Sequence, residues 1–201
     1  MSQHVPRRRR SGLVAAGFVL VGCAGCAGSG DAPVAGARQL ATPVAPRESA
    51  ERQTDPTRVE IPRIAASSSL IPLALQDSGA LEDVPFDQPQ QAGWYSGGSS
   101  PGEPGTTVVV GHVRSSGRPG VFARLQELRA GDRIRLTRAD GRTVEHTVYR
   151  TQLVPQARFP TDSVYRDEGP AELRVVTCAG RYDARHRAYT DSFVVYARPV
   201  D

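Results

Sequence analysis

The sequence predicts a mostly β, barrel-like single domain with one or two short helices. Short segments rich in apolar and β-branched residues recur between turns rich in Gly, Pro and Asp, which is typical of small all-β domains. Only one segment has the spacing of an amphipathic helix, and there is no internal repeat. The 201 residues suffice for one domain with a sizeable core and some additional sequence.

The additional sequence lies at the N-terminus. Arg7 to Arg10 precede an apolar run over 12–22, which is shorter than the roughly 20 residues that span a bilayer but fits the apolar part of an export signal. The segment 20–23 resembles the lipobox of bacterial lipoproteins, with Cys23 as the lipidated residue. We expect 1–23 to be a signal and membrane anchor that places the protein at the extracellular face of the cytoplasmic membrane. An uncleaved short anchor and simple secretion remain alternatives.

Residues 24–57 are rich in Gly, Ala, Pro and small polar residues and have no periodicity, which predicts a flexible linker. The basic charge belongs to the N-terminus as well. The chain has 25 basic residues, all arginine, and 21 acidic ones. Without the four arginines at 7–10 the two signs balance, so the sequence gives no support for nucleic-acid binding.

The folded domain is expected over 58–201, and its elements follow from local patterns. The expected strands, in chain order, are 59–64, 69–75, 106–113, 132–138, 143–154, 172–178 and 192–198. Pro62 indicates a sheet edge or a bulge in the first of them. The turn 139–142 joins two of the strands into a hairpin.

Between these strands, 76–106 is mostly turn material, and Trp94 within it is expected in the core. The segment 121–130 is expected to be an amphipathic helix that stops at Gly131. Its apolar face consists of Val121, Phe122, Leu125 and Leu128.

Two of the expected strands end in the same way. The run 106–111 leads into His112, and the run 175–177 leads into Cys178; Gly111 precedes the histidine, and Gly180 follows the cysteine by two residues. If these strands are parallel neighbours, the imidazole and the thiol meet at one mouth of the barrel. A Cys–His pair is the minimum apparatus for acyl transfer through a thioester. The alternatives are a packed or capping histidine and a buried, inert cysteine.

Cys178 has no disulfide partner in the predicted domain, because Cys23 and Cys26 lie at the membrane end. The other two histidines of the domain are expected elsewhere, His146 on a solvated strand face and His186 in a loop. Neither has a second ligand at a metal-binding spacing, so we expect neither a metal nor a cofactor.

Several segments together carry a family resemblance. They are IP at 61–62, GWY at 93–95, PGEPG at 101–105, GHV at 111–113, VF at 121–122, GD at 131–132 and LRVVTC at 173–178. Their order and surroundings resemble the sortases, the cysteine transpeptidases of Gram-positive cell surfaces. The similarity is closest to the class E and class F sortases of high-GC bacteria.

The resemblance implies an eight-stranded sortase barrel and a catalytic histidine, cysteine and arginine. By position, Cys178 attacks the Thr–Gly bond of an LPXTG-like sorting signal on a surface protein and forms a thioester. His112 protonates the leaving amine and helps to deprotonate the incoming amine of lipid II or of a pilin subunit. Thr177 either hydrogen-bonds substrate or is simply a good strand former. We expect a monomer.

The arginine is where the sequence departs from the family. Many class E sequences carry it in a Tyr-Arg-Asp-Asn stretch that opens the last strand, and 189–192 reads YTDS here, with Thr190 in its place. Arg187 is the expected substitute, ahead of Arg185 and Arg181. All three would otherwise be exposed loop cations.

Because the arginine is missing from its expected position, a second hypothesis remains, in which the protein is a catalytically silent sortase-fold binding module. A transpeptidase of the L,D type is disfavoured, because those enzymes place Ser-x-Gly before the cysteine, and 175–177 reads VVT here.

Overall fold

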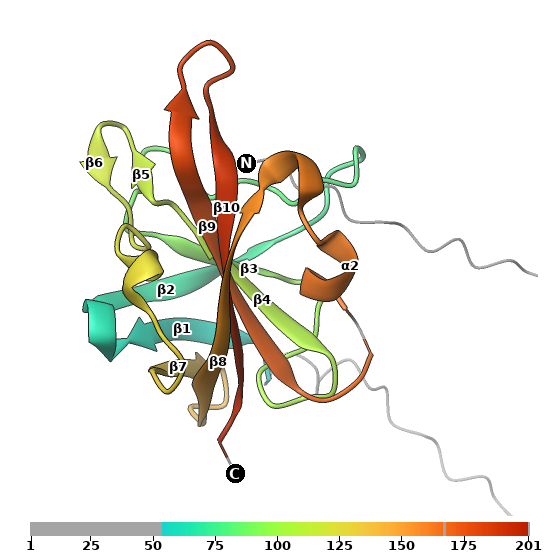
Figure 1. Ribbon diagram of the computed structural model, residues 1–201. Coiled ribbons are helices and arrows are strands. Elements are labelled where there is room, and N and C mark those ends of the chain that lie inside the picture. The colour runs from blue at the N-terminus through green and yellow to red at the C-terminus, as the bar shows by residue number, and fades with distance from the viewer. Residues whose placement is uncertain (1–53, 167, 201) are drawn as a thin grey trace, which may run out of the picture. The chain divides into compact units, whose positions relative to one another are not determined.

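The computed structural model describes residues 54–166 and 168–200, which form a closed barrel of eight strands (Figure 1). The barrel strands are β1 (Pro56–Ile61), β2 (Ala66–Leu73), β3 (Ala92–Tyr95), β4 (Thr106–Gly111), β7 (Arg133–Arg138), β8 (Thr143–Pro155), β9 (Glu172–Asp183) and β10 (Ala188–Pro199). A two-stranded ribbon, β5 (Arg114–Ser115) and β6 (Arg118–Pro119), is separate from the barrel. The predicted all-β barrel is confirmed.

The helical content is confined to short turns. They are η1 (Pro62–Ile64), η2 (Leu125–Glu127), η3 (Gln156–Arg158) and α2 (Thr161–Val164). No helix within 54–166 and 168–200 is long and apolar enough to cross a membrane. The predicted signal and anchor, with its lipidation candidate Cys23, and the linker up to residue 53 lie outside the described residues.

The strand order around the barrel is β1, β2, β3, β4, β9, β10, β8, β7, and β7 pairs with β1 to close it. The β2–β3 and β4–β9 pairings are parallel, whereas the others are antiparallel. The parallel β4–β9 pair lies in the middle of the barrel wall and joins two strands that are far apart in the sequence. The sequence did not show whether the strands that lead to His112 and Cys178 are parallel neighbours, and in the structure they are.

Alternation along the strands divides the apolar residues into two clusters. One cluster fills the barrel and draws on every barrel strand, with Trp94, Val109 and Val175 among its members. The other covers the outer face of β4, β8, β9 and β10, where Val110 and Val176 belong to it. The outer cluster is completed by side chains from the segment 81–84 and from α2. The outer face of the β4–β9 pair is therefore partly covered by irregular chain.

The predicted helix over 121–130 is wrong, although its apolar face is buried as expected. Only the single turn of η2 forms there. The amide of Val121 donates to the Pro89 carbonyl at 2.8 Å, and that of Phe122 donates to the His112 carbonyl at 3.0 Å. Further along, the amides of Leu125 and Leu128 donate to the carbonyls three residues before them, so no α-helical ladder forms and the apolar residues reach the core from a series of short turns.

Two strand predictions are also corrected. The first strand ends at Ile61, since Pro62 begins η1 and Ala65 caps that turn in a left-handed conformation with φ of 51°. The segment that was expected to be turn material contains β3, which carries Trp94 into the core with 4% of its surface exposed.

His146 does not lie on a solvated face, as the sequence predicts, but is 1% exposed. It shares the inward-facing side of β8 with Val148, two residues further along. Burial removes water from the imidazole and lowers its pKa to about 4, so the ring is neutral at neutral pH. His186 is exposed in the β9–β10 turn region, as predicted, where its Nδ1 lies 2.8 Å from an Asp183 carboxylate oxygen.

Candidate active site

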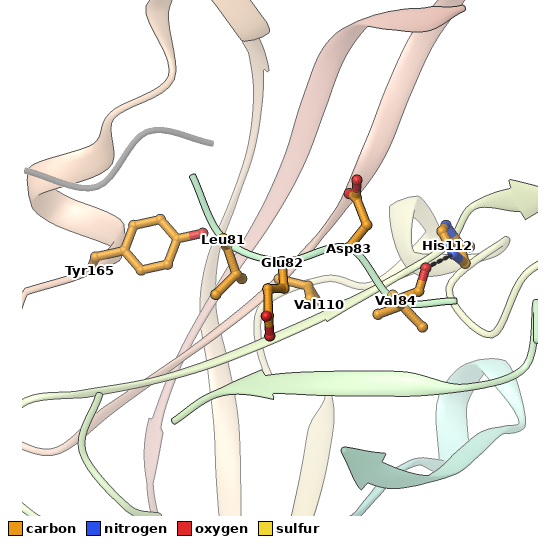
Figure 2. Close-up of a pocket in the computed structure, with 8 residues that line it drawn as sticks. Leu81, Glu82, Asp83, Val84, Val110, His112 and Tyr165 are labelled. Carbon is orange, nitrogen blue, oxygen red and sulfur yellow. Dashed lines mark hydrogen bonds between the residues drawn. The ribbon is translucent and has the colours of Figure 1, made fainter. Parts of the chain in front are cut away.

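His112 directly follows β4 and contacts both Val84 and Phe86; Figure 2 shows the hydrogen bond to Val84. Its Nε2–H donates to the Val84 carbonyl oxygen at 2.9 Å. The Phe86 ring stacks on the imidazole with centroids 5.3 Å apart. Because a carbonyl only accepts, this hydrogen bond selects the tautomer in which Nδ1 carries the lone pair. Nδ1 is therefore the ring nitrogen of His112 that can accept a proton.

Cys178 lies on β9, beside the end of β4. The last pair of the parallel β4–β9 ladder is Val110 with Val176. The Thr177 hydroxyl donates to the Gly111 carbonyl at 2.8 Å and continues the contact by one residue. The next residues along the two strands are His112 and Cys178. The structure thus brings the two predicted residues to the same end of two adjacent parallel strands.

Thr177 itself has no surface available to a substrate. Its side chain is fully buried, and its hydroxyl is engaged with the Gly111 carbonyl. The structure assigns it a positioning role, in which it joins the strand that carries the thiol to the strand that carries the imidazole. Strand alternation explains this placement, because neighbouring residues on β9 point to opposite faces.

The Cys178 thiol is partly buried, and this burial raises its pKa. The negative charge of Asp83, from the segment that also holds His112, acts in the same direction. The resting thiol is therefore mostly protonated at neutral pH. A base is needed to generate the nucleophilic thiolate, and His112 is the ionisable group placed beside it by the strands.

At the level of Cys178, a row of side chains runs across the neighbouring strands β4, β9, β10 and β8. Ser192 on β10 pairs directly with Cys178 on β9, and Val154 on β8 pairs with Ser192. Directly opposed residues of antiparallel strands point to the same face. Beyond Val154, Gln156 begins η3 and reaches back over β10, so that its Nε2 lies 4.0 Å from the Cys178 sulfur. In the described part of the chain, Gln156 is the only side chain hydrogen-bonded to that sulfur.

The structure does not bring the expected arginine to Cys178. Arg187 lies in the turn beyond β9, with φ of 52°, about 15 Å along the hairpin from the level of Cys178. This hairpin projects at the top of Figure 1. Arg181 and Arg185 are exposed on the same hairpin. Thr190, at the family's arginine position, accepts from the Arg181 amide at 3.1 Å.

A small pocket adjoins His112 on the outer face (Figure 2). The segment 81–84 forms one wall, Val110 and His112 form the floor, and Tyr165 closes the far side. The lining is mainly apolar but includes Glu82 and Asp83, and burial of Tyr165 raises the pKa of its phenol. The pocket offers a place beside the imidazole for an apolar side chain of a bound peptide.

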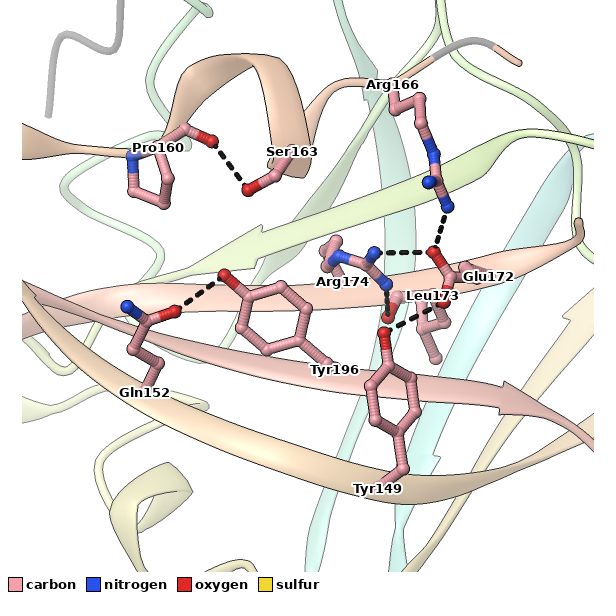
Figure 3. Close-up of polar contacts among 9 residues, drawn as sticks. All are labelled: Tyr149, Gln152, Pro160, Ser163, Arg166, Glu172, Leu173, Arg174 and Tyr196. Atoms are coloured by element: carbon pink, nitrogen blue, oxygen red, sulfur yellow. Dashed lines mark hydrogen bonds and ion pairs between the residues drawn. The ribbon is translucent and has the colours of Figure 1, made fainter. Parts of the chain in front are cut away.

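A polar cluster that the sequence did not predict lies at the start of β9, on its outer face (Figure 3). Arg174 is 3% exposed, donates to Glu172 at 2.6 Å, and lies over the Tyr196 ring at 4.5 Å. Glu172 also binds Arg166 and accepts from the Tyr149 hydroxyl at 2.8 Å. Burial acts to raise the pKa of Glu172, but these hydrogen bonds and charges together lower it. The cluster fixes the chain after α2 against the barrel, away from Cys178.

The family model for the sortase domain matches residues 59–200, and the chain belongs to the sortase family. Among curated proteins, no sequence matches this chain. No group of three or more His, Cys, Asp or Glu residues suited to a metal ion occurs in 54–166 and 168–200.

Solved sortase structures share the fold. Sortase C1 of GBS pilus island 1 is 18% identical with a TM-score of 0.56, and the match covers 72% of this chain and 63% of that one. A lid mutant of sortase A from Corynebacterium diphtheriae is 19% identical with a TM-score of 0.55, covering 72% and 69%. Sortase C-1 from Actinomyces oris is 23% identical with a TM-score of 0.56, covering 73% and 75%.

The chain therefore spans less than two thirds of the length of the GBS sortase. At these identities the likeness establishes the fold. The resemblance to class E and class F stays a prediction, because these three structures are named as sortase A or sortase C.

Proposed function

We propose that this protein is an exported, membrane-tethered cysteine transpeptidase. It cleaves an LPXTG-like sorting signal between Thr and Gly and transfers the new carboxyl end to an amine of lipid II or of a pilin subunit. The observation that carries the proposal is the parallel pairing of β4 and β9, which puts His112 and Cys178 at one strand end. The arginine-rich, apolar segment at 7–22 and Cys23 support the tether.

The order of the proton transfers follows from a protonated Cys178 thiol and a neutral His112 ring that can accept a proton at Nδ1. As the Cys178 sulfur bonds to the Thr carbonyl carbon, its proton passes to Nδ1 of His112. The imidazolium then gives that proton to the Gly nitrogen as the C–N bond breaks, which leaves a thioester on Cys178. In the second half, the incoming amine nitrogen bonds to the carbonyl carbon and His112 takes a proton from it. As the C–S bond breaks, the imidazolium gives this proton to the sulfur, which restores the resting thiol. Water substitutes for the amine when no acceptor is bound.

The test is a transfer assay on the full-length protein under reducing conditions. The purified chain is incubated with fluorogenic LPXTG-type peptides, varied at the first and fifth positions, in the presence of triglycine. We expect cleavage between Thr and Gly and a new product that carries triglycine on the Thr carboxyl, identified by mass spectrometry. Without triglycine, slower hydrolysis at the same bond is expected.

A scrambled peptide of the same composition is the control and should stay intact. Absence of both cleavage and transfer across the whole peptide panel would contradict the proposal. That outcome would favour a catalytically silent sortase-fold binding module.

A further inference from the structure

We infer that Gln156 supplies the hydrogen-bond donor to the developing oxyanion, the role for which the family uses an arginine. The inference rests on the proposed function, because it concerns the same acyl transfer at Cys178. It starts from a chemical need. When the Cys178 sulfur adds to the substrate carbonyl, negative charge gathers on the carbonyl oxygen, and a fixed donor must meet it.

Among the described residues, no arginine is hydrogen-bonded to the Cys178 sulfur. Thr190 stands at the family's arginine position, and its hydroxyl already accepts from the Arg181 amide and donates to the Asp191 carboxylate at 2.6 Å. Arg187 lies at the far end of the hairpin. The sulfur of Cys178 is hydrogen-bonded to the Gln156 amide instead, and the donor there is uncharged.

Gln156 is held at this point by the sheet. Its preceding residue, Pro155, pairs with Asp191 on β10, and Ser192, the next residue of β10, pairs with Cys178. The β8 strand thus ends one strand away from the thiol, and η3 turns the Gln156 side chain back across β10. The side chain is half-buried, so its amide is partly shielded from water while it remains open to a bound peptide.

The amide has the capacity for the task. Its NH₂ group carries two hydrogens, so one can remain near the sulfur while the other meets the oxygen on the adjacent carbon. The carbonyl oxygen is bonded to the atom that the sulfur attacks, so a donor that reaches the sulfur needs only a small side-chain rotation to reach the oxyanion.

A second observation marks the same place as a polar site. Ser192 is 1% exposed, and its hydroxyl has no hydrogen-bond partner among the described residues. It lies directly opposite Cys178, on the same face of the sheet. A buried hydroxyl without a partner is costly in an apolar core, and a thiolate or a thioester beside it provides an acceptor during the reaction. Gln156 and Ser192 together place two uncharged hydrogen-bond donors beside the thiol.

The test compares full-length variants in the peptide transfer assay. Gln156→Ala should lower kcat/KM by about 10² to 10³, mainly through kcat, because the donor acts on the oxyanion rather than on the bound peptide. Alkylation of the thiol at Cys178 by iodoacetamide should stay within about twofold of the unchanged protein. Gln152→Ala is the matched control, since Gln152 lies on β8, just before η3, and accepts from the Tyr196 hydroxyl at 3.0 Å, away from the thiol.

Gln156→Glu separates a donor from a merely structural residue. An ionised carboxylate would oppose the oxyanion, so its activity at neutral pH should fall below that of Gln156→Ala. Relative to the unchanged protein, activity should recover as the pH falls toward the ordinary pKa of a glutamate, where the carboxyl can donate. No such recovery is expected for Gln156→Ala.

The outcomes distinguish this inference from the proposed function. If the unchanged protein is active and Gln156→Ala keeps more than about a third of its kcat, the inference is wrong while the transpeptidase proposal stands. A hundredfold loss in Arg187→Ala together with a normal Gln156→Ala would assign the role to that arginine. If the unchanged protein shows no activity at all, the transpeptidase proposal fails, and the Gln156 inference fails with it.

Discussion

Replacing His112 with alanine is expected to lower kcat/KM for peptide transfer by about 10² to 10⁴. The Cys178 thiol has a raised pKa because of its burial and the nearby Asp83 carboxylate, so little thiolate exists at neutral pH without a base. Removal of the imidazole also takes away the acid that protonates the leaving amine. Steady-state rates of the full-length variant in the peptide assay measure the loss.

His186→Ala provides the matched control, because His186 is exposed and pairs only with Asp183 on the hairpin. It should retain the activity of the unchanged protein. Far-UV circular dichroism should show that His112→Ala is folded, since the ring lies at a strand end with one hydrogen bond and one stacking contact. A His112→Ala variant that keeps more than a tenth of the activity would contradict the role of His112.

The second large effect is on stability in acid. The pKa of the buried His146 is lowered to about 4 from 6.5, so the unfolded chain binds a proton in this range and the folded chain does not. The stability that depends on the neutral ring is fully present above pH 6.5 and is lost as the pH falls toward 4. The loss amounts to about 3 kcal/mol.

His146→Leu should remove this part of the acid dependence, because leucine fills a similar space beside Val148 and does not titrate. Urea unfolding of both chains at pH 7.5, 5.5 and 4.5 measures the difference. Glu172 also makes the fold less stable in acid, since its lowered pKa gives stability that is lost as it becomes protonated. Both chains keep Glu172, so their difference reports His146, and parallel curves for the two chains would contradict the assignment.

Local patterns predicted the strands that carry the site. The runs 106–111 and 175–177 are rich in β-branched residues, and both lie on buried parts of strands in the structure. The turn at 139–142 connects β7 and β8 as expected, with Gly141 at φ of 79°. In these cases side-chain periodicity and turn chemistry act over a few residues, so the sequence alone was enough.

Tertiary contacts explain what the sequence did not show. In place of the helix expected at 121–130, the chain forms turns with hydrogen bonds over three residues, and the Phe122 amide ties it to the His112 carbonyl of another element. The packing of Phe86 on His112 and the reach of Gln156 to Cys178 depend on irregular segments that have no periodic signal. The Arg187 expectation assumed a shift of three residues from the family's spacing, which falls on Thr190, and carried no information on the length of the β9–β10 hairpin.

The most direct test of covalent catalysis at Cys178 is the intact mass of the full-length protein, quenched in acid after mixing with an LPXTG-type peptide without an acceptor. We predict that the protein's mass increases by that of the peptide's acyl fragment ending at Thr, and that the added mass is located on the tryptic peptide 175–181. Triglycine should remove the added mass, and Cys178→Ala should not acquire it. Cleavage that continues in Cys178→Ala, or an adduct on any other residue, would contradict it.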